Sequence, residues 1–306
     1  MTTTENKKQE CKVIGHPVIH SLSPAMHNAA YEALGVEDQF VYSIMDTEES
    51  AQKVIQKVRD LGFRGCAFTM PYKVDVIPFL DYVDETAKKI GAVNTVVNNN
   101  GRLEGYNTDW LGVKYSLEKI TDLKGKKVAI IGAGGAARAA IYALREAGAE
   151  ISVIFNRTPE NAQELVNNFN LINCEIKGLD EIKKAGDYEV ALNMTPLGMK
   201  GIHENETPLP KKAIKEGQII FDVIYSLEDT RLIKEAKEQK AKTVPGTEMV
   251  LYQAIDQLEY HIGRKLTDEE REKVEGVMRG AVDEAREERK RETGREVKKE
   301  TRPNVS

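Results

Sequence analysis

The sequence predicts an α/β fold with two domains and an appended, charged C-terminal helix. Residues 13–70 alternate short apolar strands with helices, which is typical of a mixed, largely parallel sheet covered by helices. Residues 127–155 form a second unit, in which a buried strand, a glycine turn and an alanine-rich helix precede another apolar strand. Charges of both signs dominate beyond residue 266. A length of 306 residues suits two domains of ordinary size.

The two domains are expected to divide near residue 111. For domain 1–111 the predicted strands and helices are 13–15, 24–34, 40–45, 51–61 and 65–70, followed by a hairpin of 93–97 and 102–106. For domain 112–246 the predicted strands are 127–131, 150–155, 189–192, 218–223 and 242–244. An amphipathic helix at 247–262 is expected to pack back onto the first domain and to complete it.

The last segment, residues 263–306, is predicted to be a charged helical extension with a disordered tail. Thr267 and Glu270 have the spacing of a capping box, which marks a helix start. We expect a solvated helix from Asp268 to about Arg291 and disorder after it. A partner-binding or dimerising role is the alternative. The helix carries a thin apolar stripe of Val274, Val277, Met278, Ala281, Val282 and Ala285.

Composition excludes several classes of protein. The net charge of −5 is spread along the chain, which argues against nucleic acid or a membrane surface as the partner. No apolar run approaches the roughly 18 residues that a membrane-spanning helix needs, and the polar first ten residues predict no secretory signal. Three widely spaced cysteines fit a reducing cytoplasm. We therefore expect a cytoplasmic protein with a small-molecule ligand; its assembly stays open, with a homodimer as one alternative.

The glycine turn is a candidate dinucleotide site. A strand that runs through glycines into a helix leaves backbone N–H groups facing a pocket, where the helix dipole favours an anion such as a pyrophosphate. Gly132 permits the turn, Gly134 lets the backbone approach phosphates, and Ala137 keeps helix and strand close. The turn also contains Ala133, Gly135 and Ala136. A purely structural turn is the alternative, but the strand at 150–155 follows at the spacing of a βαβ unit, which favours a Rossmann domain.

The tip of that second strand predicts which dinucleotide is bound. Sites for NAD place an acid there, about 20 residues after the glycines, to bind the ribose 2′-hydroxyl. This chain has Asn156, Arg157 and Thr158 instead, and the guanidinium of Arg157 can pair with a 2′-phosphate. The residues therefore indicate NADP, and the alternative is that Arg157 is a solvated surface charge.

Two clusters in the first domain carry hydroxyl or charged groups. Ser23 is a good N-cap for the helix at 24–34, which leaves Ser21 unexplained, and two hydroxyls beside a helix start would form a cradle for a carboxylate. The three histidines of residues 16–27 have no acid or cysteine beside them, and their spacing spreads them over several elements, so no metal site is expected.

The second cluster suits acid–base chemistry. Lys73 follows a strand end, where a lysine in a crevice can act as an acid or base. Asp109 is its natural complement, although it is also placed to cap the next helix. Together with the amide of Asn94, these groups suit a polyhydroxylated substrate whose carbonyl is reduced.

Taken together, these motifs resemble the shikimate dehydrogenase family over residues 12–262. The matching segments are 15–28, 69–73, 91–95, 106–109, 132–137, 156–158, 193–199 and 222–225, with Gln253. The resemblance implies an N-terminal substrate domain, a Rossmann NADP-binding domain and NADPH-dependent reduction of 3-dehydroshikimate to shikimate. It implies Lys73 and Asp109 as the catalytic pair. It further implies substrate binding by Ser21, Ser23, Thr69, Asn94, Tyr225 and Gln253. The residues that would hold NADP are Gly132, Ala133, Gly134, Gly135, Ala136, Asn156, Arg157, Thr158, Thr195, Met199, Val223 and Gly246.

Three residues depart from the family's usual pattern. Ala67 stands where the family usually has Asn, and Asn161 stands where a second basic residue often follows the arginine. Glu248 interrupts a Gly-x-Gly-Met motif and is expected to put an acid near the mouth of the cleft. The alternatives are a relative that prefers quinate or NAD, and a non-catalytic ligand sensor. A sensor would be expected to have lost Lys73 or Asp109, and both are present.

Overall fold

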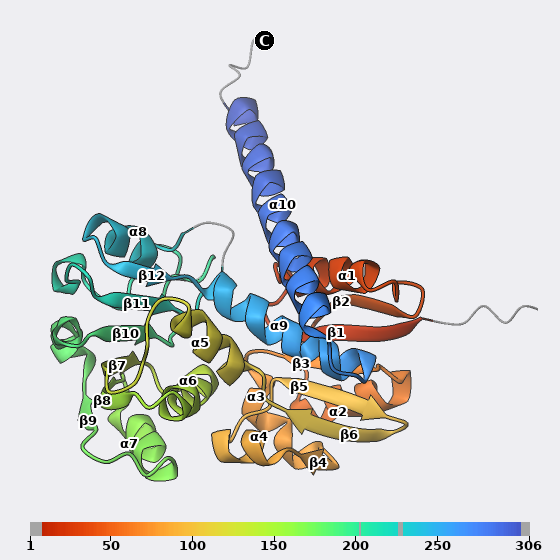
Figure 1. The fold of residues 1–306 in the computed structure, drawn as a ribbon, viewed down its shortest axis with the longest axis horizontal. Coiled ribbons are helices and arrows are strands. Elements are labelled where there is room, and N and C mark those ends of the chain that lie inside the picture. Colours follow the sequence, from red (N-terminus) through yellow and green to blue (C-terminus); the bar gives the residue numbers. More distant parts are fainter. Residues whose placement is uncertain (1–7, 202, 226–228, 301–306) are drawn as a thin grey trace, which may run out of the picture.

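A computed structural model describes residues 8–201, 203–225 and 229–300. Two six-stranded sheets lie side by side, one in each half of the molecule (Figure 1). The α/β class with a mixed N-terminal sheet, a Rossmann-type second sheet and an appended C-terminal helix is confirmed. Within the described ranges, no helix combines the length and apolar character needed to cross a membrane.

The first sheet has the order β2-β1-β3-β5-β6-β4. β1 pairs in parallel with β2 and β3, whereas β5 is antiparallel to both β3 and β6. Its strands are β1 (Gln9–Gly15), β2 (Phe40–Asp46), β3 (Gly65–Phe68), β4 (Tyr82–Val83), β5 (Thr95–Asn99) and β6 (Arg102–Tyr106). Its helices are α1 (Ser23–Ala33), α2 (Ala51–Leu61), α3 (Tyr72–Asp75) and α4 (Glu85–Ile90), with a 3₁₀ turn at Ile77–Phe79.

The second sheet is parallel throughout, with the order β12-β11-β10-β7-β8-β9. Because the chain leaves β7 first towards β8 and later returns to β10 on its other side, a crevice opens at the carboxyl end of β7. Its strands are β7 (Lys127–Ile131), β8 (Glu150–Phe155), β9 (Glu175–Lys177), β10 (Val190–Asn193), β11 (Ile219–Asp222) and β12 (Lys242–Val244). The helical segments are α5 (Asp109–Glu118), α6 (Gly135–Glu146), α7 (Pro159–Asn168), α8 (Arg231–Glu238) and the 3₁₀ turns Leu179–Asp187 and Lys211–Ala213.

Helix α9 (Gly246–Ile262) connects the two halves of the molecule (Figure 1). Near its start, Met249 belongs to the core under the second sheet, together with residues of β7 and α6. Further along, Leu251 and Leu258 belong to the core between the first sheet and α1. One rigid helix therefore packs into both cores, so its side chains hold a defined position relative to each sheet.

Helix α10 (Asp268–Glu300) corrects the expectation for the C-terminal segment. The predicted capping box is present, because the backbone N–H of Glu270 donates to the Thr267 hydroxyl and that of Thr267 donates to the Glu270 carboxylate. Val274, Met278 and Val282 are buried against α1 and α9, so the first half of the helix is packed and not merely solvated.

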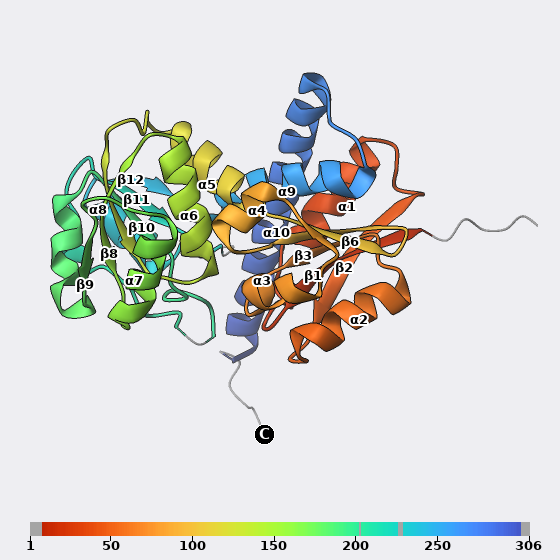
Figure 2. The same cartoon turned by 90° about the horizontal axis from the view of Figure 1, so that it is seen from below.

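The helix also runs to Glu300 and does not end near residue 291. Its second half is rich in Glu, Lys and Arg, which are good helix formers, and a packed first half supplies the nucleus for it. The predicted tail at 301–306 lies outside the described residues. Figure 1 shows this helix projecting away from the body of the molecule, and in the view of Figure 2 it runs behind the body.

Two histidines are buried between the first sheet and its covering helices. His27 of α1 stacks on Tyr42 with a ring-centroid distance of 4.2 Å, and His261 of α9 lies 5.2 Å from His27. Both ring nitrogens of His27 are buried with no hydrogen-bond partner in the described part of the chain. Burial lowers the pKa of His27 to about 3 and holds the pKa of His261 well below its usual value. Both rings are therefore neutral in the folded protein at neutral pH.

We expect the free energy of unfolding to fall as the pH drops from about 6.5 towards 3. The histidines of the unfolded chain bind protons near pH 6.5, whereas those buried in the folded chain do not. Each buried histidine therefore gives the free energy of unfolding a slope of up to about 1.4 kcal/mol per pH unit. His27→Phe preserves the stacking on Tyr42 and should reduce this slope, whereas His20→Phe, at an exposed position, should not. Urea unfolding between pH 4.5 and 7.5 measures the difference, and equal slopes in all three proteins would contradict the assignment.

Candidate active site

A cleft of about 740 Å³ lies where the first domain, the second domain and α9 meet. Residues from distant parts of the sequence line it. From the first domain these include Ser21, Ser23, Thr69, Lys73, Asn94 and Asp109, and from the second Gly134, Gly135, Ala136, Thr195, Met199, Val223 and Tyr225, with Gln253 from α9. The cleft thus brings together all six residues expected at the substrate and both members of the expected catalytic pair.

Lys73 and Asp109 form an ion pair in the cleft, with 2.6 Å between Nζ and Oδ2. The Asp109 side chain is 5% exposed and that of Lys73 is 19% exposed. Asp109 is the first residue of α5, where the helix dipole stabilises a negative charge. The expectation that Asp109 caps α5 is wrong, because Thr108 holds the cap position and the two Asp109 oxygens face Lys73 and Asn94. A lysine held beside a carboxylate at the cleft wall can supply and recover a proton.

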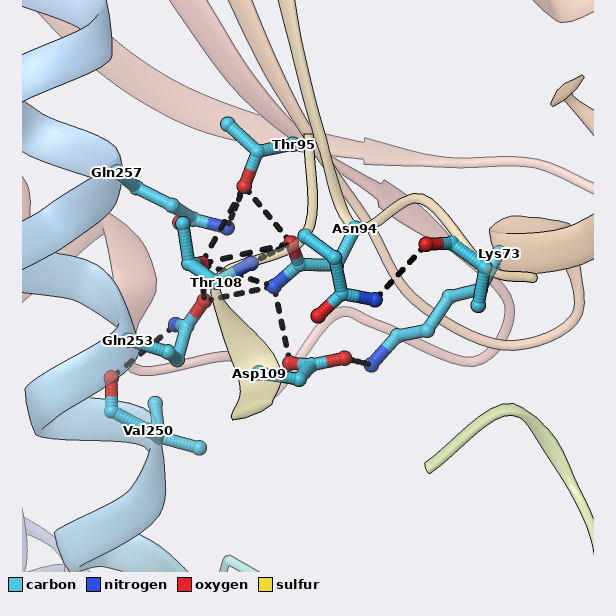
Figure 3. Close-up of polar contacts among 10 residues, drawn as sticks. Lys73, Asn94, Thr95, Thr108, Asp109, Val250, Gln253 and Gln257 are labelled. Atoms are coloured by element: carbon cyan, nitrogen blue, oxygen red, sulfur yellow. Dashed lines mark hydrogen bonds and ion pairs between the residues drawn. The ribbon is translucent and has the colours of Figure 1, made fainter. Parts of the chain in front are cut away.

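Beside this pair lies a group of buried polar side chains, Asn94, Thr108 and Gln253, here called the polar floor. The amide of Asn94 lies at its centre (Figure 3). Its Nδ2 is 2.9 Å from Asp109 Oδ1, 3.0 Å from Thr108 Oγ1 and 3.2 Å from Gln253 Oε1. The backbone N–H of Thr108 donates to Asn94 Oδ1 at 2.7 Å. Since an amide has two hydrogens and three acceptors compete for them here, a bound hydroxyl group can replace one acceptor without leaving a buried group unpaired.

Three hydroxyl groups from two domains meet at another wall of the cleft. Ser21 Oγ lies 3.2 Å from Ser23 Oγ, and Tyr225, which follows β11, is hydrogen-bonded to Ser21. Burial raises the pKa of Tyr225, so its hydroxyl keeps its proton. The expected capping role of Ser23 is wrong, because α1 begins at Ser23 itself and Leu22 occupies the cap position. The hydroxyl is therefore available to the cleft, as a carboxylate cradle requires.

Asp222 anchors the segment that carries Tyr225. This carboxylate accepts hydrogen bonds from the Thr230 hydroxyl at 2.6 Å and from the Asn193 amide at 2.8 Å. Burial raises the pKa of Asp222 to about 6, although these hydrogen bonds lower it. The sequence contained the signal, because an acid ends an otherwise apolar strand, but it did not indicate an anchoring role.

Close approach explains two of the glycines at the cleft. Gly132 has φ +108°, and a Cβ atom there would lie 2.9 Å from the carbonyl oxygen of Met194. At Gly246, where α9 begins, a Cβ atom would lie 2.6 Å from the carbonyl oxygen of Val223. A Cβ atom at Gly135 would lie 3.6 Å from Cβ of Lys73, so the start of α6 faces the ion pair. The N–H groups at the start of this helix are therefore placed to receive phosphate next to the catalytic pair.

The segment after β8 lies outside the cleft lining. Asn156 donates from its amide to the carbonyl oxygen of Thr158 at 2.7 Å, which shapes the turn. Arg157 is exposed and forms no ion pair with any described residue, so its guanidinium is available to an anion. The second basic residue that the family often has is absent, since Asn161 is exposed at the corresponding place on α7.

Comparison with known proteins decides the family. The family model "Shikimate dehydrogenase substrate binding domain" matches residues 13–96, and "Shikimate / quinate 5-dehydrogenase" matches residues 114–224. A relative from Methanosphaera stadtmanae, named shikimate dehydrogenase (NADP(+)), is 39% identical over 85% of this chain and 94% of its own length. The chain belongs to the shikimate dehydrogenase family.

Solved structures of shikimate dehydrogenases have the same fold. The enzyme from Aquifex aeolicus is 35% identical with a TM-score of 0.79, over 92% of this chain and 99% of that chain. The enzyme from Thermus thermophilus, in complex with NADP(H) and shikimate, is 36% identical with a TM-score of 0.76, over 89% and 99% of the two chains. The likeness therefore covers both domains and the cleft between them.

Two departures from the usual shikimate dehydrogenase pattern are located by the structure. Ala67 lines the cleft, and in the sheet it lies beside Val13. Glu248 does not face the cleft mouth as expected, because its carboxylate accepts two hydrogen bonds from Arg279 of α10, at 2.6 and 3.0 Å. A bidentate pair of this kind fixes both side chains, and it turns the Glu248 charge towards the extension.

Arg157→Ala is expected to raise the KM for NADP about 10- to 100-fold while leaving the KM for NAD nearly unchanged, since charge-assisted hydrogen bonds to a 2′-phosphate would be lost. Asn161→Arg, which adds a second basic residue, should lower the KM for NADP. Lys212→Ala removes an exposed charge elsewhere in the same domain and is the matched control. Equal effects of Arg157→Ala on both cofactors would show that Arg157 is only a surface charge.

Proposed function

We propose that this chain is an NADP-dependent shikimate dehydrogenase, which interconverts 3-dehydroshikimate and shikimate in the biosynthesis of aromatic amino acids. The observation that carries this conclusion is the Lys73–Asp109 ion pair, which lies between a polar floor and the start of the glycine-turn helix. The family relationship supports it, and the Thermus thermophilus enzyme is known in complex with both shikimate and NADP(H).

The substrate is held by groups of matched polarity. Ser21, Ser23 and Tyr225 bind the ring carboxylate with their three hydroxyls, which come from both domains. Thr69, Asn94 and Gln253 bind ring hydroxyls at the polar floor. Because the carboxylate and the hydroxyls are held at separate walls, the ring has one orientation, with the carbonyl carbon and its oxygen towards Lys73.

Proton transfer falls to the ion pair. The Lys73 ammonium group donates a proton to the oxygen that becomes the alcohol, and it recovers one in the reverse reaction. Asp109 binds the ammonium group of Lys73 and aims it at this oxygen, while Asn94 holds the other oxygen of the same carboxylate. Low exposure of both side chains limits competition from water.

NADPH, when bound, supplies the hydride. The turn formed by Gly132, Ala133, Gly134, Gly135 and Ala136 receives the pyrophosphate, and Asn156, Arg157 and Thr158 receive the 2′-phosphate end. Thr195, Met199 and Val223 line the cleft near the substrate and bind the nicotinamide end. Gly246 lets α9 begin directly against Val223 and Ile224.

The proposed function also fits the organisation of the chain and its partners. The substrate domain spans 1–111 and is completed by the helix at 247–262, the NADP domain spans 112–246, and 263–306 is the extension. The partners are small molecules and not nucleic acid or a membrane, in line with a spread net charge of −5. The few, separate cysteines support a cytoplasmic location. A homodimer is the assembly to test first, by light scattering.

A spectrophotometric assay of shikimate oxidation tests the function. The wild type should reduce NADP in the presence of shikimate, and Lys73→Met should lower kcat about 10²- to 10⁴-fold, because the general acid is lost. Asp109→Asn should have an effect of the same order, since it leaves Lys73 without its carboxylate. Lys114→Met removes a lysine from the nearby helix α5 and is the control.

The same assay with quinate and with NAD separates the alternatives. Turnover that favours quinate or NAD would contradict the proposed specificity while keeping the mechanism. Binding of NADP without turnover of either alcohol would contradict an enzymatic function and would favour a ligand sensor.

A further inference from the structure

Helix α9 places a second glutamine one turn after Gln253. Gln257 is 1% exposed and is among the residues that line the cleft, as is Ala67. Its Nε2 is 3.0 Å from the hydroxyl oxygen of Thr95, the residue that follows Asn94. Figure 3 shows Gln257, Thr95, Asn94, Asp109 and Lys73 as one continuous set of polar contacts.

The direction of each hydrogen bond in this set follows from one backbone group. The N–H of Thr108 can only donate, so the Asn94 atom that it meets at 2.7 Å is the oxygen Oδ1. Thr95 Oγ1 lies 2.9 Å from this same oxygen, which can only accept, so the single hydroxyl proton of Thr95 points to Asn94. The group of Gln257 that meets Thr95 must then be the donor, Nε2.

The nitrogen of the Asn94 amide is therefore directed at the Lys73–Asp109 pair. With Oδ1 held by Thr95 and Thr108, the Nδ2 group donates to Asp109 Oδ1 at 2.9 Å. The second oxygen of Asp109, Oδ2, is left for Lys73 at 2.6 Å. Hydrogen-bond donation therefore runs in one direction from Gln257 through Thr95 and Asn94 to Asp109.

This orientation leaves Gln257 Oε1 buried without a hydrogen-bond partner in the described part of the chain. The neighbouring side chain is His27, whose pKa is lowered by burial and raised to a smaller extent by its contact with Gln257. A flipped Gln257 amide would place an acceptor against Thr95, whose only proton is already directed at Asn94. The buried oxygen thus stays unpaired because the donor is needed at Thr95.

Ala67, the neighbour of Thr95 in the sheet, cannot supply a hydrogen-bond donor. In the sheet, Ala67 lies in register with Thr95 on one side and with Val13 on the other, so these three side chains stand in one row under α9. The family usually has Asn at this place, whereas the methyl group of Ala67 can make no hydrogen bond. The longer side chain of Gln257 reaches the row from the helix above it.

We infer that Gln257 is a positioning residue for the reduction: it orients Thr95, and through Thr95 the amide of Asn94, so that Asp109 presents one oxygen to Lys73. Gln257 is not a catalytic residue, because its contact with Lys73 runs only through the hydrogen bonds of Thr95, Asn94 and Asp109. The activity measurements that test this inference rest on the proposed function. Turnover of shikimate by the wild type tests that function separately.

Gln257→Met tests the inference with a side chain of similar length and no donor. It should lower kcat/KM for shikimate about five- to tenfold, as expected for one lost hydrogen bond, and should leave the affinity for NADP unchanged. Thr95→Val should have a similar effect, and the double variant should be no worse than the poorer single one, because both act through one chain. Leu258→Met, a buried neighbour in the same helix, controls for general disturbance of the core.

Gln257→Glu gives a readout that a space-filling role would not move. A protonated Glu can donate to Thr95, whereas an ionised Glu can only accept and would draw the Thr95 proton away from Asn94. The activity of Gln257→Glu relative to Gln257→Met should therefore rise as the pH falls. Any of three results would overturn the inference. These are an activity ratio that does not depend on pH, additive effects of Gln257→Met and Thr95→Val, and a fall in melting temperature with unchanged kcat/KM. Calorimetric shikimate affinity gives a second measure that does not need turnover.

Discussion

The arrangement of this protein depends on the ion pair between Lys73 and Asp109 at the wall of the cleft. Two charges removed from water are costly unless further hydrogen bonds compensate them. Three features of the chain compensate this cost or hold the two groups together. The dipole of α5 favours the carboxylate, the amide of Asn94 binds its second oxygen, and the short strand and turn before Lys73 bring the ammonium group to within 2.6 Å. Each of these supports belongs to a different segment of the chain.

The polar floor is rigid because its side chains are hydrogen-bonded to one another. Asn94, Thr95 and Thr108 are all buried, and the amide of Asn94 has both its nitrogen and its oxygen paired. In such a network the direction of one bond determines the next, so a backbone N–H at Thr108 sets the orientation of the side chains linked to it. A substrate that enters this floor meets donors and acceptors whose positions are already determined, which reduces the entropy lost on binding.

Helices α9 and α10 determine how the two domains share the cleft. Because α9 contributes to the cores under both sheets, Gln253 keeps its position relative to the glycine turn as well as to Asn94. Helix α10 adds to this on the outside, since buried apolar residues attach it to α1 while Arg279 binds Glu248 near the start of α9. The charged extension is thus part of the packing of the substrate domain over its first half, a role that its sparse apolar stripe did not suggest.

The sequence alone determined the α/β class, the alternation of elements, the glycine turn and the family, because local periodicity and short motifs carry that information. The contacts across long separations were decided by tertiary structure. Asn94 and Gln253 are 159 residues apart, and the sequence left helix capping open as an alternative role of Ser23 and Asp109, which the positions of these residues in the structure exclude. Glu248 was expected at the cleft mouth and is bound by Arg279, while Gln257 appeared only as one polar residue in a helix. Such contacts depend on how sheets and helices pack in three dimensions, and no local pattern of residues encodes them.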